Sequence, residues 1–308
     1  MRALVTGGAG FLGGRLVSRL VAEGHEVDVV DDLSTGSLAN LAEARDNAQA
    51  PGATGEVRFH QLDVRVPAVV ELLERRRPEV VFHLAWRAMD DPADDTELTV
   101  GGTLRVLQGA VRSGATKLVH GGDAVALYGV PEQRALPIRE SRPPAPVDHH
   151  GVSCWSVVEH LRIARLRMGL EFTSLAIATV YGPGDRHGPV GTAVADALAG
   201  RTIAADGPTL DLVYVDDAVD AFVRAATRGG GLVCNVGSGR ETTRSALGRL
   251  LAAQVGRPEV APGTTRQGTR FAVDPTRARI HLGWTPWTPL EEGLGEVCRW
   301  LAGDPPGP

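Results

Sequence analysis

The sequence contains few cysteines and no long apolar run, and each absence excludes a class of protein. Three cysteines among 308 residues, at positions 154, 234 and 298, form an odd and widely spaced set. Such a set argues against a disulfide framework and against a Cys-x-x-Cys metal site. No run approaches the roughly 20 apolar residues that a membrane-spanning helix needs. The formal net charge of -5 argues against a strongly basic nucleic-acid binder.

Glycines occupy the first residues where a secretory signal would carry its apolar stretch. We therefore expect a cytoplasmic protein whose partner is a small molecule rather than a nucleic acid or a membrane. Lysine is nearly absent, since Lys117 is the only one among 32 basic residues. This scarcity bears on the catalytic motif discussed below.

Short apolar runs alternate with helical patterns in the first half of the chain, which is typical of a parallel sheet wrapped by helices. The expected strands are Arg2–Thr6, Glu26–Asp31, Val57–Leu62, Glu79–Leu84, Lys117–His120 and Phe172–Ile177. The expected helices, with apolar residues three and four apart, are Phe11–Glu23, Ala68–Arg76, Glu97–Arg112, Ser153–Met168, Asp216–Ala226 and Thr243–Val255. The stretch Ala39–Gly55 is small and polar, and predicts a surface loop or a frayed helix.

These patterns predict an α/β fold with a Rossmann-type doubly wound parallel sheet over residues 1–178. From about Tyr181 onward, glycine and proline punctuate shorter elements. Residues 179–308 are therefore expected to form a smaller, mixed α/β part. Segments near residues 210–240 are expected to contribute to the first domain.

A glycine-rich turn follows the first expected strand and opens the first expected helix. Gly7, Gly10 and Gly13 have the spacing GxxGxxG, so unpaired amides at the helix N-terminus can face a pyrophosphate. Gly7 would allow the tight turn, Gly10 the close approach of the phosphates, and Gly13 close packing of helix on strand. The second strand ends in Asp31-Asp32, where a carboxylate can accept hydrogen bonds from ribose hydroxyls and repel a 2′-phosphate. The unit predicts a site for NAD rather than NADP.

Longer strings around these residues resemble the extended short-chain dehydrogenase/reductase family, often called NAD-dependent epimerase/dehydratases. They are TGGAGFLGG at 6–14, VVDDLSTG at 29–36, VFHLA at 81–85, VYGPG at 180–184, DLVYVDDAVDAF at 211–222 and NVGSG at 235–239. The resemblance covers nearly the whole chain. It implies that residues 179–308 bind the substrate, a nucleotide-activated sugar. It also implies a homodimer formed through the helices Glu97–Arg112 and Ser153–Met168.

The resemblance also implies how the cofactor is held. Asp63 and Val64 would flank the adenine, and Leu84 and Ala85 would line the path to the nicotinamide ribose. Together with the glycine turn and the second strand, the expected cofactor-binding residues are Gly7, Gly10, Phe11, Leu12, Gly13, Asp31, Asp32, Ser34, Asp63, Val64, Leu84 and Ala85.

The catalytic motif of the family is altered in this chain. Members commonly carry YxxxK, in which the lysine holds the nicotinamide ribose and the tyrosine moves a hydroxyl proton. Here the segment reads HGVSC, so His150 stands in the tyrosine position and Cys154 in the lysine position. The family's Ser/Thr position holds Asp123 or Ala124. Lys117 lies at the start of another strand, so no shift of register restores the motif.

Two interpretations of the altered motif remain open. His150 could act as acid or base, since a free imidazole titrates near neutral pH, or it could be a solvent-facing ring in a decayed site. Asp123 could orient that ring and stabilise its cation. Cys154 lies one helical turn beyond His150 on the same face, and is either a thiolate or a small apolar helix residue.

The substrate half also departs from the family pattern. Thr179 replaces an asparagine before VYGP, and Leu210 stands where an arginine that binds the diphosphate is usual. Trp86 would either wall off the pocket or pack at the edge of the domain, and Arg87 could meet an anionic substrate group. The expected substrate-binding residues are Trp86, Arg87, Tyr128, Thr179, Arg186 and Arg266. No metal site is expected from the spacing of histidines and cysteines.

Three functions are compatible with these residues. The first is an NAD-dependent epimerase or dehydratase acting on an activated sugar, or on a similar hydroxyl or ketone, with His150 in place of tyrosine. The second is a non-redox lyase, cyclase or isomerase on the same fold. The third is an inactive paralogue that binds NAD. We favour the first, because epimerisation and dehydration both use transient oxidation with a retained cofactor.

Overall fold

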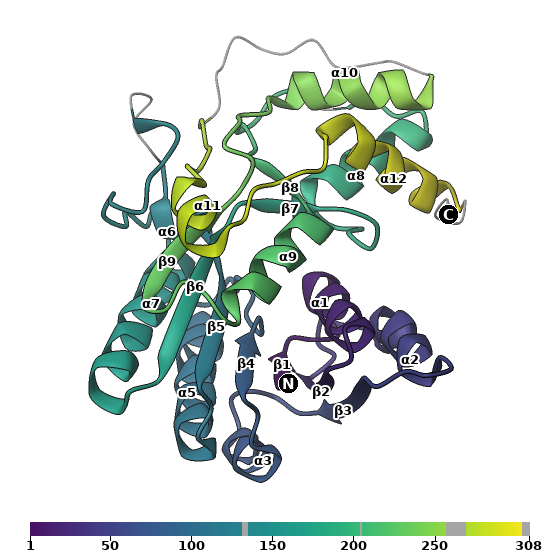
Figure 1. Cartoon of the computed structure of the whole chain (residues 1–308). Coiled ribbons are helices and arrows are strands. Elements are labelled where there is room, and N and C mark those ends of the chain that lie inside the picture. The colour runs from purple at the N-terminus through teal and green to yellow at the C-terminus, as the bar shows by residue number, and fades with distance from the viewer. Residues whose placement is uncertain (131–134, 204, 257–268, 304–308) are drawn as a thin grey trace.

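A seven-stranded parallel sheet forms the centre of the molecule (Figure 1). The computed structural model describes residues 1–130, 135–203, 205–256 and 269–303. The strand order is β3-β2-β1-β4-β5-β6-β9. These strands are β1 (Arg2–Thr6), β2 (Glu26–Asp31), β3 (Glu56–Gln61), β4 (Val80–His83), β5 (Lys117–Asp123), β6 (Glu171–Ile177) and β9 (Leu232–Val236). This architecture confirms the predicted Rossmann-type fold.

Helices cover both faces of the sheet. One face carries α1 (Phe11–Ala22), α2 (Ala42–Gln49), α9 (Val215–Ala225) and α11 (Thr276–Leu282). The other face carries α3 (Ala68–Arg76), α5 (Gly102–Ser113) and α7 (His149–Met168). Alternate residues of β1 divide the two cores, because Ala3 and Val5 pack on the first face and Leu4 on the second.

Two helices begin earlier than the apolar pattern predicts, because polar caps start them. Asp91 accepts hydrogen bonds from the amides of Ala93 and Asp94, and so begins α4 (Pro92–Thr96). The short helix continues through a π-helical turn, Glu97–Gly101, into α5. Asp148 caps α7 in the same way by accepting from the amide of Gly151. Residues 42–49, expected to be a loop or a frayed helix, form α2.

A smaller layer lies apart from the sheet, at the top of Figure 1. Three helices, α8 (Pro189–Leu198), α10 (Arg244–Val255) and α12 (Leu290–Ala302), share one apolar cluster with the short parallel strands β7 (Thr179–Tyr181) and β8 (Leu212–Tyr214). The apolar pattern did not predict α8 or α12. Among the described residues, no helix is both long and apolar enough to cross a membrane.

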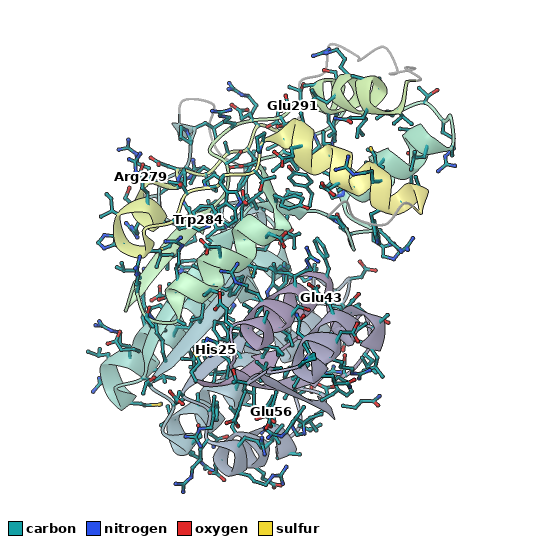
Figure 2. The ribbon with its side chains drawn as sticks, turned by 45° about the vertical axis from the view of Figure 1, so that its right-hand side comes forward. His25, Glu43, Glu56, Arg279, Trp284 and Glu291 are labelled. Carbon is teal, nitrogen blue, oxygen red and sulfur yellow. The ribbon has the colours of Figure 1, made fainter. Side chains whose placement is uncertain are left out.

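Trp284 anchors the segment between α11 and α12 to α9, as Figure 2 illustrates. Its ring is fully buried and its indole N–H donates to the carbonyl of Asp217 over 2.7 Å. The Asp217 carboxylate in turn accepts from the amides of Trp287 and Thr288 and from the Thr288 hydroxyl. These bonds hold the segment between α11 and α12 against α9.

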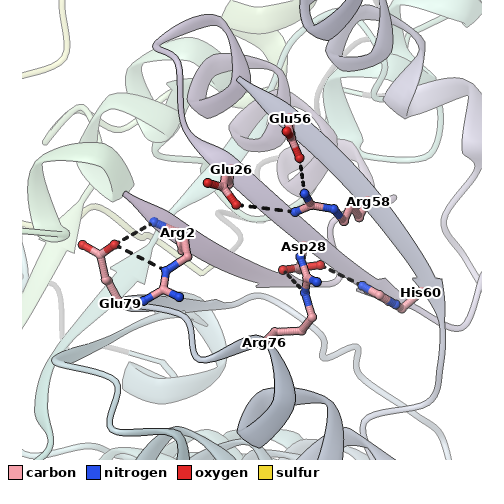
Figure 3. A network of polar contacts seen from close by, with 8 residues as sticks. All are labelled: Arg2, Glu26, Asp28, Glu56, Arg58, His60, Arg76 and Glu79. Carbon is pink, nitrogen blue, oxygen red and sulfur yellow. Dashed lines mark hydrogen bonds and ion pairs between the residues drawn. The ribbon is translucent and has the colours of Figure 1, made fainter. Parts of the chain in front are cut away.

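A network of ion pairs crosses β1, β2, β3 and α3 (Figure 3). One of its carboxylates, that of Asp28 on β2, is buried. The Asp28 carboxylate accepts from His60 Nε2 and from Arg76 Nε, each over 2.8 Å. Because the carboxylate is buried and both partners are mostly covered, this interaction is screened by water much less than a surface ion pair.

We expect Asp28→Ala to lower the free energy of unfolding by about 2 kcal/mol, because Arg76 and His60 lose their shared partner. The matched control is Glu74→Ala, which removes an exposed ion pair with Arg112 and is expected to cost below about 1 kcal/mol. Urea denaturation of both variants measures the difference. Equal losses in the two variants would contradict a special contribution from Asp28.

Candidate active site

A pocket lies at the carboxyl ends of β1, β2 and β4, where the glycine-rich turn meets the sheet. Every residue predicted to bind the cofactor lines it. These residues are Gly7, Gly10, Phe11, Leu12, Gly13, Asp31, Asp32, Ser34, Asp63, Val64, Leu84 and Ala85. The lining also includes Val30, Thr35, Leu62, Leu98, Gly121 and Ile177, which the sequence analysis did not select.

The turn after β1 leaves room for a backbone but not for side chains. Gly7 has φ +69°, and a Cβ there would lie 2.8 Å from the carbonyl carbon and oxygen of Leu84. A Cβ on Gly13 would overlap the carbonyl oxygen of Gly7. No side chain caps the N-terminus of α1 at Gly10, so its first amides remain available to an anion. This cradle suits the pyrophosphate of a dinucleotide.

Asp31 holds the turn in place from the end of β2. Its two carboxylate oxygens accept from the amides of Ala9 and Leu33, each over 2.9 Å, and its side chain is buried. Asp32, which is exposed at the rim, accepts from the amide and hydroxyl of Ser34. Two carboxylates at this edge concentrate negative charge where a 2′-phosphate would have to lie.

Asp63 lines the same pocket beyond the end of β3. Arg65 binds its carboxylate through both Nε and a terminal nitrogen, at 2.9 and 2.7 Å. Burial acts to raise the pKa of Asp63, but the hydrogen bonds from Arg65 outweigh it and leave that pKa below its ordinary value. The carboxylate is therefore ionised at neutral pH and is an acceptor only.

The segment that replaces YxxxK begins α7 and is buried. His150 and Cys154 are 4% and 5% exposed, one helical turn apart on the same face as predicted. The His150 Nδ1 lies 2.8 Å from a carboxylate oxygen of Asp95, and its Nε2 lies 3.5 Å from the Cys154 sulfur. Both ring nitrogens of the imidazole thus have a partner, and the ring does not face solvent.

Asp95 was not selected from the sequence. It lies on α4 with no exposed surface, among several acidic neighbours that are exposed. The sequence spacing could have indicated that Asp95 is buried. Leu98 and Thr99 follow it by three and four residues, on the same helix face, and both are buried. Extending the helical pattern N-terminally past Glu97 would have placed Asp95 on the inward face.

Trp86 separates the imidazole from the pocket. The indole lines the pocket, and its ring centroid lies 5.3 Å from that of His150 at an interplanar angle of 30°. Its N–H donates to the carbonyl of Gly121, which fixes the ring against the end of β5. Trp86 is therefore a wall of the pocket rather than a ring at the edge of the domain. Arg87 lines the pocket beside it.

Asp123 does not orient the imidazole, contrary to the expectation from sequence. Its carboxylate instead caps α6 (Ala124–Tyr128) by accepting from the amides of Val125 and Ala126 at 2.7 and 3.0 Å. The hydrogen-bonded carboxylate on His150 is that of Asp95. Helix geometry explains the difference, since an aspartate directly before a helix satisfies the amides of its first turn.

Cys154 is a neutral thiol rather than the thiolate considered above. Burial raises its pKa to about 12, and the nearby Asp123 carboxylate adds to the rise. At neutral pH the sulfur therefore carries its proton and is a weak donor toward His150 Nε2.

The expected substrate-binding residues are not gathered at one place. Tyr128 is buried and its hydroxyl donates to the Asn235 side chain over 2.8 Å, so this hydroxyl already has a partner. Burial raises the pKa of this phenol above its ordinary value. Thr179 lies on β7, half-buried, with its amide bonded to the carbonyl of Asp211. Of the five members of that set that the structure describes, only Trp86 and Arg87 line the dinucleotide pocket.

Arg186 lies on the far side of the glycine turn. Its guanidinium is stacked 4.5 Å above the Trp300 ring, and both residues line a separate cleft of about 1140 Å³. Gly10 and Phe11 line this cleft as well as the dinucleotide pocket. Arg266 lies outside the described residues. No group of three or more metal-ligating side chains occurs among the residues that the structure describes.

Comparisons with known proteins agree with this geometry. Residues 3–237 match the NAD dependent epimerase/dehydratase family. A UDP-glucose 4-epimerase from Mycolicibacterium smegmatis is 39% identical, with 98% of each chain covered. A crystal structure of UDP-glucose 4-epimerase with UDP-glucose from Thermotoga maritima has a TM-score of 0.88 at 31% identity, covering 98% of this chain and 99% of that one. The UDP-glucose 4-epimerase of Thermus thermophilus, in complex with NAD, has a TM-score of 0.86 at 30% identity, with the same coverage.

The match spans most of the chain, and the pocket presents a dinucleotide cradle at the place that the fold requires. The chain therefore belongs to the NAD-dependent epimerase/dehydratase family and is an NAD-dependent enzyme of that type.

Proposed function

We propose that this enzyme epimerises a UDP-activated hexose at C4, with His150 as the group that moves the hydroxyl proton. The observation that carries the proposal is the pairing of a complete dinucleotide cradle with a buried imidazole next to its inner wall. Relatives over the full length that are named UDP-glucose 4-epimerase support the choice of substrate.

The chain's own residues supply the binding and the proton transfer. The glycine turn and the pocket around it would hold NAD, which would supply the reversible hydride chemistry at the sugar carbon. His150 Nε2 takes the proton of the hydroxyl on that carbon, and gives it back after the hydride returns. The thiol of Cys154 is a weak donor at 3.5 Å, so a sugar hydroxyl can displace it from Nε2.

Trp86 must move for this reaction to occur. Its ring lies against the imidazole and lines the pocket, so the indole occupies the approach to His150. We infer that substrate binding turns the indole away from the carbonyl of Gly121. Arg87, next along the chain and also on the pocket wall, is placed to bind an anionic group of the substrate.

The test is an assay of the purified protein with UDP-galactose and UDP-glucose, without added cofactor. We expect interconversion of the two sugars, and we expect deuterium placed at C4 to remain in the product because the hydride never exchanges with water. Washing the label out into solvent would indicate non-redox proton exchange and contradict the mechanism. Absence of interconversion with both sugars would overturn the proposed substrate.

We also propose that the enzyme is a homodimer formed through α5 and α7. A cavity of about 620 Å³ lies between these helices, and exposed apolar residues line it. They include Leu104, Ile163 and Met168. Exposed apolar side chains on these two neighbouring helices suit packing against a second copy of the chain.

Ile163→Glu is expected to give a monomer, because a carboxylate would replace an apolar side chain that packs in the dimer interface. Ile280→Glu is the matched control, since Ile280 is 67% exposed on α11 and away from this face. Light scattering after size exclusion measures both masses. A dimeric Ile163→Glu variant would show that the interface lies elsewhere.

A further inference from the structure

Asp95 is a buried acid whose charge is only partly satisfied. One carboxylate oxygen accepts from the amide of Met89 over 3.2 Å and contacts His150 Nδ1 over 2.8 Å. The other oxygen is buried and has no hydrogen-bond partner among the described residues. Burying a carboxylate in this way destabilises the fold unless a positive charge can face it.

The groups around Asp95 and His150 show which side chain can supply that positive charge. Within the described residues, His150 is the one basic side chain that forms an ion pair or a hydrogen bond with Asp95. The other titratable groups near the ring are Cys154 on α7, Asp123 at the end of β5 and Asp148 at the cap of α7. Cys154, Asp123 and Asp148 cannot become cations, and His149 contacts the carbonyl of Met89 instead. His150 is therefore the ring that can face Asp95 as a cation once it takes up a proton.

A carboxylate on Nδ1 also fixes which nitrogen carries the ring proton. Because the ionised Asp95 oxygen can only accept, Nδ1 must be the donor. The lone pair is then on Nε2, the nitrogen that faces Cys154. This is the tautomer that a proton acceptor requires at Nε2.

We infer that Asp95 is a positioning residue for His150, an inference that rests on the proposed function. It holds the proton on Nδ1 and leaves Nε2 free to take the substrate's hydroxyl proton. The ring then becomes a cation that faces the unprotonated carboxylate, and the proton returns from Nε2 to the sugar oxygen after the hydride returns. Asp95 itself is never protonated and touches neither substrate nor cofactor.

The first arm of the test is Asp95→Asn, which keeps the shape of the side chain and removes its charge. We expect kcat to fall by about 10²-fold with KM changed by less than about threefold, since substrate contacts are intact. Asp94→Asn is the matched control, because Asp94 is exposed on the same helix and is expected to keep full activity. A fall of less than about threefold in kcat for Asp95→Asn would overturn the inference.

The second arm reads the tautomer in the unaltered holoenzyme, and a variant serves only to assign the signal. Nitrogen-15 spectra of histidine-labelled protein report which ring nitrogen is protonated, and the signal that disappears in His150→Gln identifies the residue. We expect a single tautomer protonated at Nδ1, and a proton found on Nε2 instead would overturn the inference. If the enzyme fails to epimerise either UDP-sugar, the proposed function is lost, while this spectrum still decides whether Asp95 sets the tautomer.

Discussion

Gly13→Ala is expected to leave the protein without retained NAD, with at least about 100-fold weaker binding of added cofactor. A methyl group on this residue would overlap the carbonyl oxygen of Gly7, so the turn would have to open. The turn cannot open freely, because the Ala9 amide is bonded to the buried Asp31 carboxylate. Since the pyrophosphate is held by backbone amides of this turn and of α1, a shift of a few tenths of an ångström costs several hydrogen bonds at once.

The measurement is the NAD released on denaturation, followed by titration calorimetry with NAD. Gly101→Ala is the matched control, because Gly101 has φ -59° and a Cβ there would meet only atoms 3.9 Å away. We expect the control to retain the cofactor of the unaltered protein. Full occupancy in Gly13→Ala would show that the cofactor is not held by this turn.

His150→Ala is expected to lower turnover by 10²-fold or more, with little change in the affinity for NAD. The loss follows from removing the proposed proton acceptor, for which neither Cys154 nor Asp123 is a substitute. Cys154 keeps its proton at neutral pH, and Asp123 is engaged at the start of α6. The cofactor affinity is expected to persist because the imidazole does not line the dinucleotide pocket.

Steady-state kinetics with the UDP-sugar and calorimetry with NAD separate the two effects. His281→Ala serves as the control, since His281 is exposed on α11 and away from the site. Unchanged turnover in His150→Ala would eliminate the imidazole as the proton acceptor. Loss of NAD affinity equal to the loss of turnover would assign the residue to binding instead.

The cofactor half of the site could be predicted because local sequence determines it. A glycine turn between a strand and a helix, followed by an acid at the end of the next strand, needs no distant partner to be recognised. The bounds of β1 and β2 are those predicted, because each strand is a short apolar run ended by turn residues. The same reasoning placed His150 and Cys154 on one helix face.

The proton-handling half could not be predicted in full, because its partners come from distant segments. The stretch DPADDTE offers several acids, and only the register set by the Asp91 cap turns Asp95 inward. Asp123 was expected to orient His150 because it stands at the family's Ser/Thr position, but its carboxylate accepts hydrogen bonds from the first amides of α6. Tyr128 was expected to bind the substrate, but its hydroxyl is bonded to Asn235, which lies 107 positions away in the chain.

The edge strand β9 has a consequence for how the protein is synthesised. It pairs with β6, yet it follows β7, α8, β8 and α9 in the chain. When only the first 178 residues have left the ribosome, β9 has not yet been synthesised, and β6 is the unpaired edge strand of the sheet. Unpaired strand edges recruit other chains, so this nascent intermediate is the stage at which aggregation or chaperone capture is most favourable. A protein truncated after residue 178 would likewise leave the β6 edge of the sheet unpaired.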